Sequence, residues 1–492
     1  MEESTKTSPL KQRTARGLLW GFISSSSMQV LNVVFGIVLT FCLNSEDYGM
    51  MAVLSIYSAI AASLQDSGFV AALTNKSRPT HRDYNSVFWF NITCSAVIYA
   101  ILWFCAPLIA DYNHDLRLIP LSRYTFIGFF VASFSITPRA ILFKQMRVKE
   151  QTIINLVALV VSGIVGISMA LCKMAFWSIA TQSIVFVGIT ALLSWHFSGW
   201  RPTFTVTFQP IRQMLPFSFK LLITNIFFNI NKFAFESVLG NFYPKSDIGF
   251  YSQANKWNQM GSQTIGGMVQ SVAQPMFVEV GNDPERQRRV FIKMLQFTAF
   301  VAFPALFGLS LVAHQLISFL PDRWMPAADY LQLLAIAGAF MPLATLYSNF
   351  IIAQGKSNIY MWNMIAQSIV ILLNIFAVQY FHIHIFGLSG IWLMIAIYIT
   401  ANIVWIPIWH IFVYRQIQLQ LWETLRAILP SLIVAAIAMI VTHYATSAIT
   451  TNHLVLLIMR IPLAAVIYIG IMRLTHSGIL DECLNYMRHR KQ

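Results

Sequence analysis

The sequence predicts an all-α polytopic membrane protein, and three observations lead to that prediction. Hydrophobic residues occupy 57% of the 492 positions and charged residues only 11%, whereas a soluble globular protein carries about 25% charged residues. Long apolar segments recur from Gly17 to Leu474. Most Lys and Arg residues fall in alternate connections between these segments. Together these features are typical of a chain that crosses a lipid bilayer many times.

The hydropathy pattern predicts fourteen transmembrane helices, since each crossing needs about 20 mostly apolar residues. The first segment is too long for a signal-peptide core and lacks a convincing cleavage site, so it is expected to be a permanent helix. The segment 249–276 is the least apolar. The helices are expected at about residues 17–42, 49–74, 85–110, 118–141, 151–172, 174–198, 214–242, 249–276, 294–320, 329–354, 359–381, 386–413, 427–446 and 453–474.

The distribution of basic residues predicts that both ends of the chain are cytosolic. The N-terminal tail, the even-numbered connections and the C-terminus contain most of the 33 Lys and Arg residues. The opposite connections contain only Arg117, Arg123, Lys173, Lys245 and Arg323. Cytosolic connections of membrane proteins are enriched in Lys and Arg. The net charge of +14 is therefore interpreted as a topology signal and not as a sign of nucleic-acid binding.

A short internal repeat suggests two similar halves. Val38-Leu39 followed by Asp47-Tyr48-Gly49 recurs as Val238-Leu239 followed by Asp247-Ile248-Gly249. Six predicted helices separate the copies, so their topology is parallel, as in transporters built from two like halves. The expected divisions are a tail 1–16, a first lobe 17–198, a second lobe 199–413, two additional helices in 414–474 and a tail 475–492.

Polar residues form stripes on several predicted helices. A polar side chain in hydrocarbon is costly, so such stripes are expected to face a water-filled cavity or another helix. The stripe in 214–242 lies within roughly 60° at 100° per residue, and similar faces occur in 249–276, 17–42 and 49–74. In that order the residues are Ser218, Asn225, Asn229, Lys232 and Glu236; Ser252, Lys256, Gln259, Gln263, Gln270 and Gln274; Ser25, Gln29 and Asn32; and Ser55, Ser58, Gln65 and Asp66.

A cavity lined by these stripes would be biased towards positive charge. Such a cavity suits a ligand with an anionic group and many hydroxyls, because Asn and Gln amides both donate and accept hydrogen bonds. Alternative interpretations stay open. Lys232 and Glu236 are four residues apart and can neutralise each other. Lys256 and Lys220 can extend to the headgroups, and this interpretation is favoured for Arg460. The amides can join helices. Asp66 is favoured as an ion or proton site.

Several chemistries are not predicted. The sequence contains no GxxxxGK[ST] motif for ATP, and its histidines are scattered, so neither an ATP engine nor a metal site is expected. Every predicted external connection is short, which disfavours a membrane polymerase or ligase with a large external catalytic loop. No segment resembles a channel filter. We therefore expect a transporter and not an enzyme.

Several segments resemble the Wzx-type polysaccharide flippases, the polysaccharide group of the multidrug/oligosaccharidyl-lipid/polysaccharide exporter superfamily. The resemblance covers most of the first twelve predicted helices, and no single motif in it is catalytic. The segments are TARGLLWGF, SEDYGMMAVLSIYSAI, DSGFVAALTNK, TPRAILFKQMRVKE, WRPTFTVTFQPIRQMLPFSFKLLITNIFFNINKFAFESVLG and DIGFYSQANKW.

This resemblance implies two six-helix bundles in a V with two extra C-terminal helices. It implies a flippase in the bacterial inner membrane that moves an undecaprenyl-pyrophosphate-linked oligosaccharide to the outer leaflet by alternating access. By position, the cavity would be lined or bordered by Asp66, Lys220, Asn229, Lys232, Glu236 and Lys256. Many relatives carry Asp where this chain has Lys232 in NINK, so an acid role does not transfer to that position.

We therefore expect a substrate cavity, two candidates for ion coupling and no bound cofactor. The cavity residues are Lys232, Lys256, Asn229, Asn225, Gln259, Gln263, Gln29, Asn32 and Lys220, and the ion-coupling residues are Asp66 and Glu236. A proton or a sodium ion is the expected coupling ion. Membrane lipids and other proteins of polysaccharide assembly are further expected partners. The alternative function is a multidrug or other cation-coupled exporter of the same superfamily, which usually needs acids in its cavity.

Overall fold

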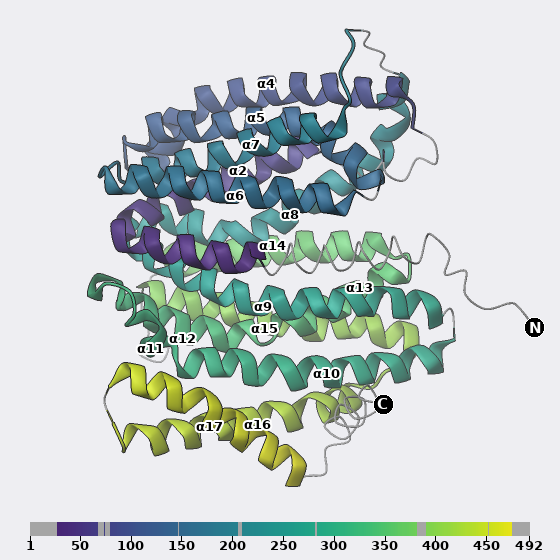
Figure 1. Ribbon diagram of the computed structural model, residues 1–492. Coiled ribbons are helices and arrows are strands. Elements are labelled where there is room, and N and C mark those ends of the chain that lie inside the picture. Colours follow the sequence, from purple (N-terminus) through teal and green to yellow (C-terminus); the bar gives the residue numbers. More distant parts are fainter. Residues whose placement is uncertain are drawn as a thin grey trace, which may run out of the picture. The chain divides into compact units, whose positions relative to one another are not determined.

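The computed structural model describes residues 27–66, 73, 79–145, 147–204, 209–280, 283–380, 390–450 and 452–474 (Figure 1). In these ranges every regular element is a helix. The helices are Ser27–Cys42, α2 (Ser45–Asp66), α4 (His81–Tyr112), α5 (Leu118–Lys144), α6 (Val148–Leu171), α7 (Trp177–Ser198), α8 (Gln209–Phe242), α9 (Lys245–Val280), α10 (Pro284–Leu311), α11 (Ala313–Ile317), η1 (Asp322–Trp324), α12 (Pro326–Gly338), α13 (Met341–Ala353), α14 (Ser357–Tyr380), α15 (Gly390–Ile417), α16 (Leu421–Ser447) and α17 (His453–Leu474).

Each of the fourteen predicted segments corresponds to helical structure. In the described part of the chain, eleven helices are long and apolar enough to cross a membrane, and Ser27–Cys42 is a shorter apolar helix. The remaining two, α8 and α9, contain 34 and 36 residues, so each is about 50 Å long at 1.5 Å per residue. They are the helices with the strongest polar stripes, which is why hydropathy alone ranks them low.

Two of the departures from the expected boundaries have local reasons. Helix α10 begins at Pro284, ten residues before the expected position, because Asp283 caps it by accepting from the backbone N–H groups of Glu285 and Arg286. This charged first turn is invisible to hydropathy. The expected helix 329–354 is divided into α12 and α13, with Pro342 in the first turn of α13, a position that proline favours.

The internal repeat has the same local geometry in both copies. Helix Ser27–Cys42 is followed by α2 at Ser45, and α8 ends at Phe242 and is followed by α9 at Lys245. The backbone N–H of Leu43 donates to the Leu39 carbonyl at 2.8 Å, and Tyr243 donates to Leu239 at 3.0 Å. The two helix–turn–helix segments therefore match residue for residue at a spacing of 200 positions.

The first compact unit comprises Met1–Ile248. Within it α5 packs between α4 and α7, α6 packs on α7, and α2 packs on α8. Hydrogen bonds reinforce the α5–α7 contact: Trp195 Nε1 donates to the Phe134 carbonyl at 2.6 Å, and the hydroxyls of Tyr124 and Thr181 are 2.9 Å apart. The division predicted at residue 199 rests on the repeat and stays a prediction.

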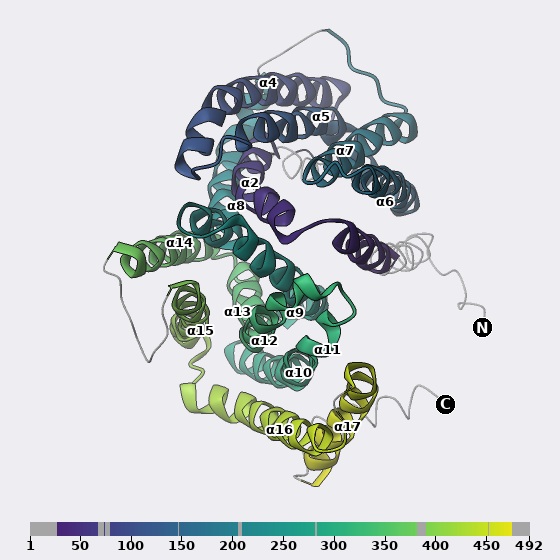
Figure 2. The ribbon, with the colours of Figure 1, turned by 90° about the vertical axis from the view of Figure 1, so that its left-hand side faces the viewer.

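The second compact unit comprises Gly249–Gln492, and α10 is its central helix. Figure 2 shows α10 flanked by α12 and α16. An ion pair joins Arg288 of α10 to Glu423 of α16, and the Tyr468 hydroxyl of α17 donates to the Phe300 carbonyl at 3.0 Å. The last two helices are therefore fixed to α10 at several depths.

Candidate functional site

Helix α9 carries an exposed polar stripe along most of its length. Lys256, Gln263 and Gln270 are exposed and Gln259 is half-buried. Gln263 Nε2 donates to Gln259 Oε1 at 3.1 Å, so two of the amides lie end to end along the helix. The opposite face packs in the second unit through the buried residues Tyr251, Ala254, Ile265 and Val269. The helix is therefore amphipathic, with its polar face turned away from its own unit.

This stripe is not compatible with a face that contacts lipid tails. Amides and an ammonium that lie in hydrocarbon without partners are costly. Among the described residues, no hydrogen bond or ion pair of the Lys256 ammonium is found. Water or a polar ligand must satisfy these groups. The ammonium of Lys256 and the amides of Gln259, Gln263 and Gln270 offer a row of donors together with the acceptor oxygens of the amides.

Helix α8 brings a second group of predicted residues together with α2. Asn229 Nδ2 donates to the Ser63 hydroxyl at 2.8 Å and to the Asn225 carbonyl at 3.0 Å. Asn225 and Asn229 are half-buried, so the amide of Asn229 joins two helices while part of its surface stays accessible. The interpretation of the amides as links between helices therefore applies to Asn229.

One turn further along α8, a cation and an acid lie close together. Lys232 is half-buried, its Nζ lies 5.0 Å from the centre of the Phe233 ring, and Glu236 is 6% exposed. Glu236 is the charged group that acts electrostatically on the Lys232 ammonium. Lys232 and Glu236 therefore form a partly buried charge pair in the first unit. For Lys232 to bind an anionic ligand, or for Glu236 to bind a coupling ion, the attraction between the two side chains must first be replaced by the new contact.

The end of α8 is held tightly against α2 and α4. The Ser237 hydroxyl donates to the Val53 carbonyl at 2.8 Å. A Cβ atom on Gly240 would lie 2.5 Å from Val53 Cγ2 and 2.6 Å from Asn113 Oδ1, so only glycine permits this approach. The Lys245 ammonium donates to the carbonyls of Gly240 and Asn113 at 2.5 and 3.0 Å.

Lys245 itself is the first residue of α9, directly after the turn that follows α8, and its surroundings disfavour the charged form. Burial lowers its pKa to about 8, although attraction by Asp115 opposes that change. Asp115 and Glu46 are held by Arg117 at 2.8 and 2.6 Å. The sequence placed Lys245 in an external connection and gave no sign of this contact, because its partners are carbonyl groups that have no sequence signal.

The structure gives less information on the other predicted cavity and ion-coupling residues. Gln29 is half-buried and Asn32 exposed on helix Ser27–Cys42. Asp66 is the last residue of α2 and Lys220 belongs to α8, but the side chains of both lie outside the described part of the chain. The assignment of all these residues to a cavity stays a prediction.

Arg460 differs from its expected position. It was expected to extend to the headgroups, but it is 4% exposed. Its guanidinium donates to the Leu311 carbonyl, Gln315 Oε1 and the hydroxyls of Thr446 and Ser447 at 3.0–3.1 Å. The prediction of snorkelling is therefore wrong for Arg460. Its partners lie up to 149 positions away in sequence, so no local pattern indicated them.

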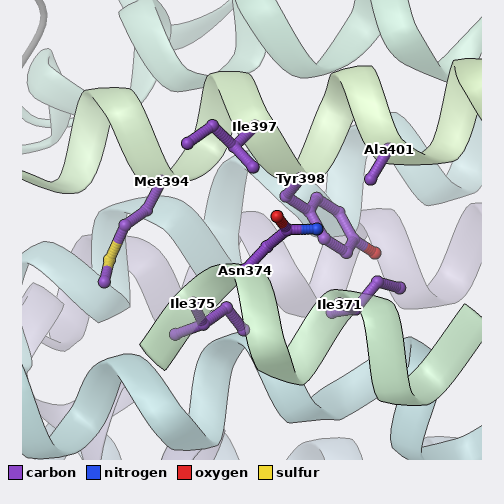
Figure 3. Close-up of a pocket in the computed structure, with 7 residues that line it drawn as sticks. All are labelled: Ile371, Asn374, Ile375, Met394, Ile397, Tyr398 and Ala401. Atoms are coloured by element: carbon purple, nitrogen blue, oxygen red, sulfur yellow. The ribbon is translucent and has the colours of Figure 1, made fainter. Parts of the chain in front are cut away.

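A small, mostly apolar pocket lies between α14 and α15 (Figure 3), lined by Ile371, Asn374, Ile375, Met394, Ile397, Tyr398 and Ala401. Asn374 Nδ2 donates to the Val370 carbonyl at 2.8 Å. Nearby, Gln367 Nε2 donates to Asn402 Oδ1 at 3.0 Å. The amides of this helix pair therefore serve packing, and the pocket contains none of the predicted cavity residues.

The sequence comparisons identify the family. A family model described as polysaccharide biosynthesis protein matches residues 38–329, more than half of the chain. The chain belongs to this polysaccharide biosynthesis family. It is 22% identical over 357 residues to the lipopolysaccharide biosynthesis protein WzxC of Escherichia coli K12, covering 71% of this chain and 72% of WzxC. The succinoglycan biosynthesis transport protein ExoT of Rhizobium meliloti is 23% identical, covering 70% of each chain.

Solved structures agree with the expected fold. The lipid II flippase MurJ in its inward closed conformation has a TM-score of 0.73 at 14% identity, covering 94% of this chain and 100% of MurJ. An inward-facing multidrug resistance transporter of the MATE family, in the MOP superfamily, has a TM-score of 0.64 at 14% identity, covering 80% of this chain and 94% of its own. The expected fold class and family resemblance are therefore confirmed, and this family member is a multi-pass membrane protein.

Proposed function

We propose that this protein moves an undecaprenyl-pyrophosphate-linked oligosaccharide from the cytosolic to the outer leaflet by alternating access. The observation that carries the proposal is the exposed stripe of α9, in which amides accompany a lysine. A lipid-linked oligosaccharide has an anionic pyrophosphate, many hydroxyls and an apolar tail. The ammonium of Lys256 suits the pyrophosphate, and the amides of Gln259, Gln263 and Gln270 suit the sugars. The tail would stay in the bilayer.

The residues of α8 would extend the same binding chemistry. Lys232 offers a second ammonium, and the exposed part of the Asn225 and Asn229 amides offers further hydrogen bonds. Exchange of a proton or sodium ion at Glu236 or Asp66 would reset the transporter. At Glu236, the electrostatic attraction to Lys232 would weaken when the ligand anion binds that cation. In this proposal both termini are cytosolic and the substrate is loaded from the cytosolic leaflet.

A multidrug exporter is the main alternative, because such proteins share this fold. Cationic drugs would require an acid at the binding surface. The exposed stripe of α9 carries one lysine and no acid at its four polar positions, which favours an anionic substrate. The similarity to the lipopolysaccharide biosynthesis protein WzxC and the succinoglycan biosynthesis transport protein ExoT points in the same direction.

Reconstitution tests the proposal. Purified protein in vesicles would be supplied with a fluorescent undecaprenyl-pyrophosphate oligosaccharide, and movement between leaflets would be followed by a membrane-impermeant quencher. Wild-type protein should accelerate the movement, and Lys256→Gln should reduce the rate about tenfold, equivalent to about 1.4 kcal/mol. Lys356→Gln is the matched control, because Lys356 is exposed in the turn after α13. No acceleration by wild-type protein would overturn the proposal.

A further inference from the structure

Gly267 lies in the α9 stripe, near its Gln270 end. It is four residues after Gln263 and three before Gln270, and at 100° per residue Lys256, Gln259, Gln263, Gly267 and Gln270 fall within about 80°. Gly267 is exposed, and a Cβ atom added to it would meet nothing within 4 Å. The stripe extends about 21 Å from Lys256 to Gln270 at 1.5 Å per residue, with bare backbone between its last two amides.

The folded chain gives no packing reason for this glycine. Glycine in a helix interior is less favourable than alanine, because it loses more backbone freedom when the helix forms. Two other helical glycines have a visible packing reason: a Cβ on Gly338 would lie 1.9 Å from Asn258 Oδ1, and one on Gly240 would contact Val53. Gly188 and Gly470 also have open space beside them, but neither belongs to the α9 stripe. Gly266, the immediate neighbour, is buried and faces Thr345, whose Oγ1 would be 3.5 Å from an added Cβ. At Gly267 the space is open.

We infer that Gly267 is a position that determines substrate specificity, where the bare backbone of α9 admits the face of a sugar ring between the amides of Gln263 and Gln270. This inference rests on the proposed function. Glycine is the residue that lets a ligand approach the backbone closely. Gln263 lies one turn before the gap and Gln270 one turn after it, so their amides can bond hydroxyls on opposite edges of the ring. A side chain at position 267 would fill the space that the ring occupies.

The inference predicts that a side chain at position 267 slows transport only for substrates whose sugar chain is long enough to reach that position. An anionic pyrophosphate held at Lys256 would be about 16 Å from Gly267 along the helix axis. A lipid pyrophosphate with a single sugar would leave the gap empty, whereas a longer oligosaccharide would reach it. Bulk at Gly267 should therefore slow the longer substrate selectively.

The experiment compares two single-methyl substitutions in the reconstituted full chain. Gly267→Ala and Gly266→Ala add the same atom at neighbouring helix positions, one on the stripe and one facing Thr345. Two substrates are used, undecaprenyl pyrophosphate carrying one sugar and the same lipid carrying an oligosaccharide of several sugars. Thermal unfolding checks the fold, and both variants should be at least as stable as wild type, because alanine favours the helix.

Gly267→Ala should lower the rate for the oligosaccharide about tenfold, equivalent to about 1.4 kcal/mol, and leave the single-sugar substrate within about twofold. Gly266→Ala should leave both rates near wild type. Equal rates for Gly267→Ala and wild type, or equal losses for both substrates, would overturn the inference while the proposed function stands. A wild-type protein that moves neither substrate would overturn the proposed function as well.

Discussion

The Arg460 guanidinium of α17 donates to the carbonyl oxygen of Leu311, the last residue of α10, at 3.0 Å. The hydroxyls of Thr446 and Ser447, in the last turn of α16, accept from the same side chain. Two helices therefore end at this cation, and the negative ends of their dipoles stabilise it. Its other acceptor among these contacts is the Gln315 side-chain oxygen at 3.0 Å, and Nδ1 of His443 lies 3.4 Å from the guanidinium. The contact fixes the last two helices to α10.

Replacing Arg460 by methionine should destabilise the second unit, because a carbonyl and several buried side-chain acceptors would lose their donor. The free energy of unfolding should fall by about 3 kcal/mol, measured by thermal or denaturant unfolding in detergent. Arg473→Met is the control, since Arg473 is exposed on the same helix. Equal stability of the two variants would mean that the buried contacts of Arg460 contribute nothing.

Adding a methyl group to Gly240 should separate α8 from α2. The new Cβ would lie 2.5 Å from Val53 Cγ2, so Gly240→Ala should cost about 1–3 kcal/mol of stability through overpacking. Gly188→Ala in α7 is the matched control, because its Cβ would meet nothing within 4 Å and should stabilise the helix. A Gly240→Ala variant that is more stable than wild type would contradict the close contact between α8 and α2 at this position.

The buried ammonium of Lys245 should make stability depend on pH. Its pKa is about 8 in the folded protein, below the ordinary value of about 10.4. Between these values the unfolded chain binds more protons, so stability should rise as pH increases from about 8 to 10. The difference in unfolding temperature between wild type and Lys245→Gln, measured across this range, isolates the contribution. A difference that does not change with pH would contradict the burial of Lys245.

A double-mutant cycle should separate structure from function at Lys232 and Glu236. Lys232→Gln removes the cation beside a buried acid and should cost about 1–3 kcal/mol of stability. The double variant Lys232→Gln/Glu236→Gln should recover most of that loss, because neither charge remains. Transport of the lipid-linked oligosaccharide should stay low in the double variant. If the double variant recovers both stability and transport, Lys232 and Glu236 serve only to neutralise each other and have no direct role in transport.

The sequence was sufficient for the helices because their signal is local. Apolar length and alternating basic connections located the fourteen segments, and the polar stripe of α9 was visible as a pattern at helical spacing. The start of α10 was missed because Asp283 caps a charged turn. The environments of Arg460 and Lys245 depend on carbonyl groups brought together by the fold, which no residue pattern encodes. The proposed role of Gly267 could not be predicted from the sequence, because it depends on the open space beside the residue in the folded chain.

The most direct test of the central claim is the labelling of a cysteine in the α9 stripe, in a cysteine-free background, by a hydrophilic thiol reagent. Gln263→Cys should react, and a lipid-linked oligosaccharide should protect it. Ile458→Cys, at a position on α17 that is 63% exposed and apolar, should react only with a lipid-soluble reagent. A Gln263→Cys variant that behaves like Ile458→Cys would place the stripe against lipid tails and contradict the account.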